Sequence, residues 1–240
     1  MSTGTLRWFA AEYHFPSTYS CRLPLSSPAS ALISPAPGPA TVRLALLRVG
    51  IELFGHEVCR QTLFPWLSVA RLSIRPPKQV AFSEQVLRAY KATEKDGSVF
   101  LGESVIYREM AHAEDSMMLY MELPVEEGET WHLLFKSIGY WGQASSFATC
   151  LAISADAPVE NECVLPLQDV SSSASLQPFF SCILSEFRNP HLSWQDVVPQ
   201  ERDGPSETAS NALKWDIYVW PLQVVRQSSR STLLVRSPFP

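Results

Sequence analysis

The segment from Ala36 to Gly55, APGPATVRLALLRVGIELFG, constrains the fold more than any other part of the chain. Proline fixes the backbone angle φ and lacks an N–H, so Pro39, directly after Gly38, suits the first position of a helix. The apolar residues that follow have the spacing of a buried helical stripe: Val42, Ala45, Leu46, Val49 and Leu53. The sequence therefore predicts a Pro/Gly turn that leads into an amphipathic helix ending near Cys59, with Pro65 interrupting any continuation.

Arg43 lies in the first turn of this predicted helix, where the helix dipole disfavours a bare cation. The unsatisfied N–H groups of a helix start favour an anion, so one interpretation gives Arg43 a phosphate partner. The alternative is an ordinary amphipathic helix that carries a solvated arginine.

Composition excludes several classes of protein. The chain has 240 residues, of which 46% are hydrophobic and 18% charged, so it can bury a sizeable core. Its five cysteines form no C-x-x-C pair, which argues against a disulfide framework or a structural zinc site. No stretch approaches the roughly 18 apolar residues that a membrane span requires. We expect a cytoplasmic protein with no membrane contact, no metal and no cofactor.

The charge is unevenly distributed along the chain. A net charge of −5 argues against a protein that coats nucleic acid indiscriminately. Between Thr41 and Met110, however, ten basic residues stand against seven acidic ones. This distribution suits a subunit that grips a nucleic acid at one place and faces protein partners elsewhere.

Alternating and helical patterns predict the order strand, helix, strand, arm, strand, helix, strand. The second helix is predicted at Thr130–Ile138, with Leu133, Leu134 and Ile138 facing inward. The predicted strands are Trp8–Phe15, Thr18–Leu25, Leu67–Arg75, Ser116–Pro124, Ala148–Ser154 and Lys214–Val225. Helices on one face of a mainly antiparallel sheet give an α+β fold, and β-α-β-β-α-β is the ferredoxin-like order.

The arm, from Lys78 to Met110, is predicted to be a long hairpin that turns at Asp96-Gly97. It carries the cations and rings that suit phosphates and stacked bases: Arg88, Tyr90, Lys91, Tyr107 and Arg108. The alternative is an ordinary exposed hairpin whose tyrosines pack onto the sheet.

Few motifs of catalytic chemistry are present. The common nucleotide-binding, zinc-hydrolase and serine-hydrolase motifs do not occur. His14, Tyr90 and Lys91 have the residue types that a metal-free ribonuclease uses as acid, base and cation, although their spacing does not single them out. The loop GYWGQASSF, from Gly139, can hold a phosphate or a partner loop, or can simply cap the preceding helix.

Several segments together resemble the Cas-five family of CRISPR-associated RAMP proteins. The likeness rests on STYSCRLPL, the proline-rich loop that closes on PGPATVRLALLR, the strand end RLSIRPP, the arm segments VLRAYKA and YREMAHA, and KSIGYWGQASSF. It covers about residues 7–150, and the last third of the chain matches weakly. The order of these short motifs carries more weight than any one of them.

The resemblance implies a single ferredoxin-like (RRM-like) RAMP domain over residues 1–240, with a protruding thumb hairpin at about residues 78–110 and a less certain C-terminal part at residues 151–240. It implies a subunit of a type I Cascade-like surveillance complex that binds the 5′ handle of the CRISPR RNA (crRNA) and caps one end. In such proteins the thumb wedges into the guide and touches the neighbouring backbone subunit. The implied partners are crRNA, a Cas-seven-like backbone subunit, a Cas-eight-like large subunit and, indirectly, target DNA.

Carried across by position, the resemblance implies a set of RNA-contact residues. These are Arg43, Arg75, Lys78, Arg88, Tyr90, Lys91, Arg108, Lys136, Tyr140, Trp141 and Gln143. Two family features are not found: a C-terminal glycine-rich loop, and the Tyr/Lys/His set with which one subtype cuts precursor RNA. We therefore predict a non-cleaving RNA binder. The alternatives are a metal-independent endoribonuclease that processes precursor crRNA, and a protein-interaction subunit without nucleic-acid contact.

Overall fold

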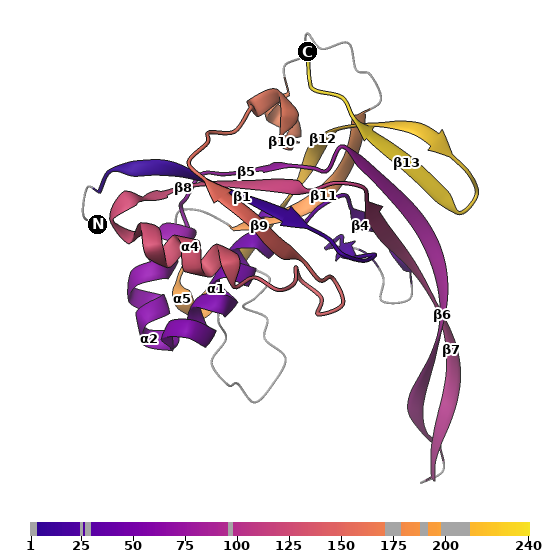
Figure 1. The fold of residues 1–240 in the computed structure, drawn as a ribbon. Coiled ribbons are helices and arrows are strands. Elements are labelled where there is room, and N and C mark those ends of the chain that lie inside the picture. The colour runs from indigo at the N-terminus through magenta and orange to yellow at the C-terminus, as the bar shows by residue number, and fades with distance from the viewer. Residues whose placement is uncertain are drawn as a thin grey trace.

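The computed structural model describes residues 4–24, 26, 30–95, 98–170, 179–187, 192–197 and 212–240. Helices combine with mostly antiparallel strands in two main sheets (Figure 1). The first sheet has four antiparallel strands in the order β5 (Leu72–Arg75), β8 (Met117–Pro124), β1 (Leu6–His14) and β9 (Thr149–Ser154).

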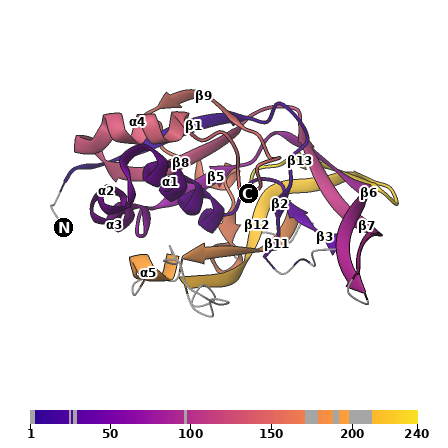
Figure 2. The same cartoon turned by 90° about the horizontal axis from the view of Figure 1, so that it is seen from below.

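The two longer helices lie on one face of this sheet. Helix α1 (Pro39–Phe54) lies between β1 and β5 in the chain, and α4 (Gly128–Lys136) lies between β8 and β9. Figures 1 and 2 show both helices on the same side of the four strands. Along the chain these elements follow one another as β-α-β-β-α-β, so the predicted α+β class and element order are confirmed.

Alternation along the central strands builds the core between sheet and helices. On β1, Phe9, Ala11 and Tyr13 point toward the helices and are fully buried. Trp131 and Leu134 of α4 meet them from the other side. Two of the large polar rings are bonded to the backbone: the Tyr13 hydroxyl donates to the Phe135 carbonyl at 2.8 Å, and the Trp131 indole N–H donates to the Pro124 carbonyl at 3.1 Å.

A second, seven-stranded sheet contains the hairpin and the last third of the chain. Its order is β10 (Leu165–Pro166), β12 (Leu213–Gln227), β13 (Ser231–Arg236), β6 (Gln79–Lys95), β7 (Ser98–Ala113) and β3 (Ser30–Ala31), with β11 (Phe179–Phe187) also paired to β12. The sequence patterns predict β12 but neither β11 nor β13. The single-sheet prediction is therefore wrong, because pairing of β13 with β6 attaches the C-terminal strands to the hairpin.

The predicted hairpin is confirmed. Strands β6 and β7 pair residue by residue from Val80 opposite Ala113 to Lys95 opposite Ser98, while the predicted turn, Asp96-Gly97, lies outside the described residues. The hairpin base is paired on both sides, to β13 and to β3, and its distal part protrudes from the body (Figure 1).

The chain after α1 differs from the prediction. Gly55, with φ of +83°, ends α1, and the chain remains helical through α2 (His56–Val58), a π-helical turn (Cys59–Leu63) and α3 (Phe64–Leu67). Pro65 does not interrupt these turns, because it occupies the first turn of α3, where a missing N–H costs nothing. The strand predicted at Leu67–Arg75 is consequently reduced to β5.

Other predicted boundaries also change. The strand predicted at Thr18–Leu25 is only β2 (Cys21–Arg22), which pairs with β4 (Ile33–Ser34). Leu53 and Leu133, both predicted to be inward, are exposed. The remaining short helical elements are α5 (Trp194–Val197) and single turns at Val125–Glu127, Glu160–Glu162 and Leu167–Asp169. No helix within the described ranges is long and apolar enough to cross a membrane.

Candidate nucleic-acid interface

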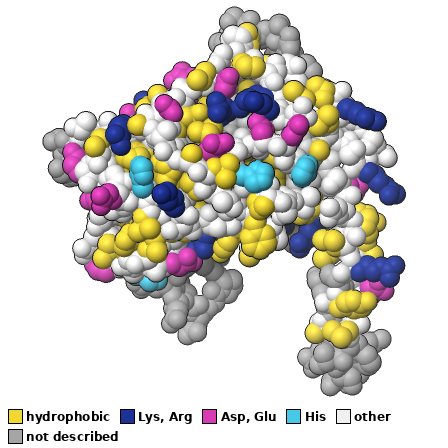
Figure 3. All heavy atoms as spheres, in the orientation of Figure 1, with side chains coloured by type: hydrophobic (Ala, Val, Ile, Leu, Met, Phe, Trp, Pro, Cys, Tyr) yellow, Lys and Arg dark blue, Asp and Glu magenta, His cyan; other side chains and the backbone are white. Residues whose placement is uncertain are grey.

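The hairpin exposes a row of apolar and aromatic side chains. Neighbouring residues of a strand point to opposite faces, so Val86, Arg88 and Tyr90 of β6 share one face with Leu101, Val105 and Tyr107 of β7. We call these six residues the apolar hairpin face. Tyr90 is 66% exposed and Leu101 74%. Figure 3 shows hydrophobic side chains along the protruding hairpin, interspersed with charged ones.

Two arginines of the hairpin are available to a ligand. Arg88 lies 3.2 Å from Glu103, but its side chain is 76% exposed, so the ion pair is weak and a phosphate can displace it. Arg108 projects from the opposite face of the hairpin and has no partner among the described residues. Lys91 lies on β6 three residues beyond Arg88 towards the hairpin tip, opposite Gly102, and its side chain falls outside the described part of the chain.

The base of the hairpin is acidic. Glu84 and Glu109 face each other across the two strands and line a hollow of about 280 Å³. Burial raises the pKa of the Glu109 carboxyl, the Ile33 N–H that donates to it at 3.2 Å lowers that pKa, and the charge of Glu84 raises it further. Two carboxylates repel a phosphate, so the base of the apolar hairpin face does not suit an RNA backbone.

A groove lies beside α1, where the loop after α4 folds back. Tyr140 pairs with Phe147, and the backbone N–H of Trp141 donates to the Ser146 carbonyl at 3.1 Å. Residues 140–147 therefore form a tight loop. Gly142, with φ of +66°, brings this loop against Thr41: a Cβ atom at Gly142 would lie 3.5 Å from the Thr41 methyl. We call the two hollows on either side of this contact the α1 groove.

The first hollow of the α1 groove holds a stacked cation. It measures about 240 Å³, and Arg48 lies over the Tyr140 ring at 4.0 Å and bonds to Glu52 at 2.9 Å. Tyr140 is a predicted RNA-contact residue, but Arg48 was not predicted. The only local signal for Arg48 is its place in PATVRLALLR as the second arginine on an otherwise apolar helix.

The second hollow of the α1 groove measures about 330 Å³. It brings the predicted Trp141 and Gln143 together with residues that were not predicted. Its lining consists of Ser20, Cys21, Arg22, Leu23, Pro24, Ser26, Thr41, Trp141, Gly142 and Gln143.

The α1 groove and the hairpin are joined by the segment that contains β2 and β3. Tyr19 pairs with Ala111 at the hairpin base, and the next residue, Ser20, exchanges hydrogen bonds with Ser146 of the loop (3.0 and 3.2 Å). Seen from below, β2 and β3 lie between α1 and the hairpin (Figure 2). The segment that contains β2 and β3 therefore links the loop of the α1 groove to the hairpin base.

Arg43 is buried and paired with a carboxylate, so the interpretation that gave it a phosphate partner is wrong. Its side chain is 7% exposed and its Nε donates to Glu186 of β11 at 2.8 Å. The same guanidinium donates to the carbonyls of Leu67 and Ala70, so its charge is paired and each of its three nitrogens has a partner inside the protein. The N-terminus of α1 is also inaccessible to a phosphate, because residues 33–40 are all buried.

The prediction that Trp141 contacts RNA also needs correction. The side chain is fully buried and meets the Tyr13 ring edge-on, with 4.9 Å between the ring centroids. Gly142, with φ of +66°, directly follows Trp141 in this loop, whose indole is turned inward. Trp141 therefore offers no face on which a base can stack.

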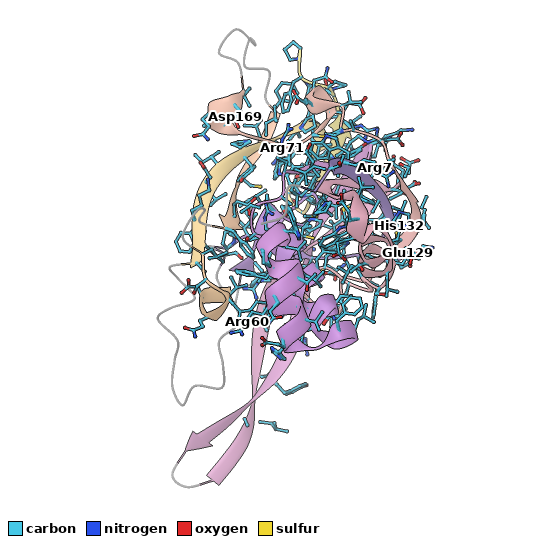
Figure 4. The ribbon with its side chains drawn as sticks, turned by 90° about the vertical axis from the view of Figure 1, so that its left-hand side faces the viewer. Arg7, Arg60, Arg71, Glu129, His132 and Asp169 are labelled. Carbon is cyan, nitrogen blue, oxygen red and sulfur yellow. The ribbon has the colours of Figure 1, made fainter. Side chains whose placement is uncertain are left out.

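Three further predicted residues lie apart from the α1 groove. Arg75 of β5 bonds to Glu162 at 3.2 Å, and the backbone N–H of the exposed Lys78 donates to Asp115 at 2.6 Å. Lys136 lines a separate hollow of about 680 Å³ at α4, together with Arg7, Glu129 and His132. Figure 4 shows Arg7, Glu129 and His132 on one side of the molecule.

The residue types of a metal-free ribonuclease are not assembled. His14 ends β1 in the first sheet, whereas Tyr90 lies eight residues beyond Phe82 on the hairpin, on the order of 26 Å along an extended strand. Within the described ranges, no group of three His, Cys, Asp or Glu side chains could hold a metal ion.

Comparisons with known proteins point to CRISPR systems. The chain is 30% identical over 86 residues to the CRISPR-associated protein Cas5 of Archaeoglobus fulgidus, a match that spans 36% of this chain and 38% of that protein. No family model matches the chain.

Two solved structures are similar at low sequence identity. A CRISPR protein from Archaeoglobus fulgidus is 11% identical, with 97% of this chain and 93% of that chain covered and a TM-score of 0.47. A chain of a CRISPR RNA-guided surveillance complex is 12% identical, with 96% and 91% covered and a TM-score of 0.41. The sequence likeness to the CRISPR-associated protein Cas5 is thus confined to an 86-residue segment, little more than a third of either chain.

Proposed function

We propose that this protein is a non-catalytic RNA-binding subunit of a type I, Cascade-like CRISPR surveillance complex. In this proposal it holds the 5′ handle of the crRNA and caps the backbone filament in the cytoplasm. The likeness to Cas5 supports a role in a CRISPR system. The element succession β-α-β-β-α-β, with strand order β5-β8-β1-β9, supports a ferredoxin-like RAMP fold.

One observation carries the proposal: exposed cations and a ring lie on the hairpin and beside the α1 groove, two regions that the segment with Tyr19 and Ser20 joins. Arg88, Arg108 and Arg22 supply positive charge without competing buried carboxylates, and Tyr90 supplies an exposed ring. Cations that follow the backbone and rings that stack on bases are the elements of single-strand recognition. A strand that starts in the α1 groove and continues past β2 reaches the hairpin.

The apolar hairpin face supports a protein partner. Exposed apolar patches on a folded domain mark interaction sites, and the carboxylates of Glu84 and Glu109 at the hairpin base disfavour RNA there. We assign the exposed apolar side chains of this face, Val86, Leu101 and Val105, to the neighbouring Cas-seven-like backbone subunit. We assign Arg88, Tyr90 and Arg108 to the guide. A Cas-eight-like large subunit and target DNA complete the proposed assembly.

Arginine substitutions on the hairpin test the RNA contact. Arg88→Ala and Arg108→Ala should each weaken binding of a crRNA fragment and reduce the salt slope of log affinity by about one for each lost phosphate contact. Arg60→Ala is the matched control, because Arg60 is also an exposed arginine in an ion pair, with Glu57 at 2.8 Å, but lies on the helical side of the molecule. Equal affinity and slope in all four proteins would contradict the proposal.

Purification of the native assembly tests the wider claim. RNA recovered with the chain should share a common 5′ end, because the proposed site holds the handle. Cleavage of a labelled precursor in the presence of chelator would instead support the endoribonuclease alternative. An assembly that contains the chain and no RNA would support the protein-interaction alternative.

A further inference from the structure

The hollow at the base of the hairpin contains two carboxylates that face each other. Glu84 of β6 lies directly opposite Glu109 of β7, and both line the space of about 280 Å³ between the hairpin base, β3 and the turn from β12 to β13. We call this space the acidic hollow. Like charges directly opposite each other in a sheet are destabilising. Folding alone therefore does not explain why the chain carries a glutamate on both strands here.

The chain itself does not neutralise this pair. Among the described residues neither side chain forms an ion pair, and the Glu109 carboxylate accepts only the Ile33 N–H, at 3.2 Å. The cation in the lining is Arg230: its backbone carbonyl accepts the Glu84 N–H at 2.9 Å, while its exposed side chain bonds to neither carboxylate. Burial and the charge of Glu84 both raise the pKa of Glu109, as expected for a carboxyl group that lacks a cationic partner.

Exposed apolar side chains surround the acidic hollow. Leu32 and Tyr107 belong to its lining and are 53% and 47% exposed. Val86, which is 59% exposed, lies directly opposite Tyr107 on the hairpin. The acidic hollow is therefore continuous with the apolar hairpin face, and the two together form one surface of apolar contacts around an uncompensated negative charge. A protein partner fits such a surface, because exposed apolar patches mark interaction sites and opposite charges fix the register of an interface.

The lining also restricts the chemistry of what enters the hollow. Two carboxylates repel a phosphate, and within the described ranges no group of three acidic, histidine or cysteine side chains could hold a metal ion. A guanidinium bonds to carboxylate oxygens in pairs and stacks on aromatic rings, which suits Glu84 and Glu109 beside Tyr107. The ammonium group of a lysine supplies the same charge.

We propose that the acidic hollow receives a basic side chain, arginine or lysine, of the protein subunit that packs on the apolar hairpin face. The inference rests on the proposed function and deepens it, because it states which charge the partner subunit carries beside its apolar contact. It also gives the acidic pair a role. The repulsion between Glu84 and Glu109 in the free chain becomes attraction for the partner's cation in the assembly.

Reversing one charge of the pair tests the proposal, with opposite effects on folding and on docking. In the free chain, Glu84→Lys should raise the melting temperature, because attraction to Glu109 replaces repulsion across the strands. In the native assembly, purified through a tag on this chain, Glu84→Lys should lower the recovery of the docked subunit about tenfold, because it repels the partner's cation. A folding defect would lower both quantities.

Two further variants control for net charge and for shape. Glu114→Lys makes the same change in net charge at an exposed glutamate just beyond β7, outside the lining, and should leave recovery unchanged. Glu109→Gln keeps an acceptor for the Ile33 N–H, removes the charge, and should lower recovery by a smaller factor than Glu84→Lys. Wild-type recovery with Glu84→Lys, or the same loss with Glu114→Lys, would overturn the proposal.

A crosslink identifies the partner's side chain. Leu32, at the rim of the acidic hollow, is replaced by the photoreactive p-benzoylphenylalanine, and the assembly is irradiated. The coupled peptide should belong to a protein subunit and contain an arginine or lysine, and changing that residue to glutamate should restore recovery with Glu84→Lys. Coupling to RNA, a peptide without a basic residue, or no rescue by the exchanged charges would each refute the proposal.

RNA binding by the free chain separates this proposal from the proposed function. Glu84→Lys should bind the crRNA fragment with the salt slope of wild type, whereas Arg88→Ala should not. If Glu84→Lys increases that slope by about one and leaves subunit recovery unchanged, the acidic hollow faces the RNA backbone and only the RNA-binding function stands. RNA without any docked subunit in the wild-type assembly leads to the same conclusion. If wild type recovers neither RNA nor protein subunits, both proposals fail.

Discussion

At the residue scale, the chemistry of Arg43 is decided by a carboxylate 143 positions away in the sequence. A cation in the first turn of α1 needs a negative partner, as the sequence indicates, and Glu186 supplies it from β11. The guanidinium also bonds to the carbonyls of Leu67 and Ala70, where the turns after α1 end. One buried side chain therefore joins a helix, a loop and a strand of the second sheet.

Arg43→Ala should lower the free energy of unfolding by about 3 kcal/mol, since it leaves the Glu186 carboxylate and two carbonyls without their donor in a buried place. Urea denaturation measures the change. The exposed Arg60→Ala variant should lose less than about 1 kcal/mol. A stable Arg43→Ala protein with weakened RNA binding would return Arg43 to the interface.

Glu109 should make stability depend on pH. Burial raises its pKa in the folded protein, so the folded state binds this proton more tightly than the unfolded chain. Stability should therefore fall as pH rises from the ordinary glutamate value through the raised pKa. Glu109→Gln, which keeps an acceptor for the Ile33 N–H, should remove that fall. Urea midpoints between about pH 4 and 7 measure it, and identical pH profiles for both proteins would refute the assignment.

At the element scale, the hairpin divides into a supported base and a free arm. Near Phe82 and Ala111 its strands pair with β13, with β3 and with Tyr19. Beyond Val86 and Tyr107 the two strands pair only with each other. Isolated two-stranded ribbons are marginally stable in water, so a binding role explains the length of this arm better than a folding role.

Replacing residues 87–106 by a tight turn should therefore leave the fold intact. Among the residues of this segment whose side chains are described, none belongs to the buried core, so we expect a melting temperature within a few degrees of wild type. RNA affinity should drop, because Arg88 and Tyr90 are lost. Circular dichroism melts and RNA titrations measure the two effects. Loss of cooperative unfolding would show that the arm stabilises the body.

At the scale of the whole molecule, the two sheets share one core. The main buried cluster includes Phe9 of the first sheet and Trp220 and Leu234 of the second, with α1 between them. The C-terminal strands thus support the hairpin base through β13 and hold Arg43 through β11. The 86-residue likeness to Cas5 covers only about a third of this arrangement.

The sequence by itself determined the elements whose signal is local. The apolar stripe of Val42, Leu46 and Val49 has the period of a helix, and β8 is a short apolar run of strand length, so both can be read without a partner. Local patterns predict the α+β order and the long hairpin, whereas the resemblance to the Cas-five family proposed Tyr140 to Gln143 as contacts.

Only the tertiary structure decided which of the predicted contact residues are exposed and which are buried. Arg43 and Trp141 carry the same local signals as an exposed cation and an exposed ring, but pairing with Glu186 and packing on Tyr13 place both inside. The candidate site also includes Arg48, Ser20 and Arg22, because the loop after α4 packs against α1 and β2. Contacts between residues distant in the chain depend on how the sheets pair, and a local pattern does not contain that information.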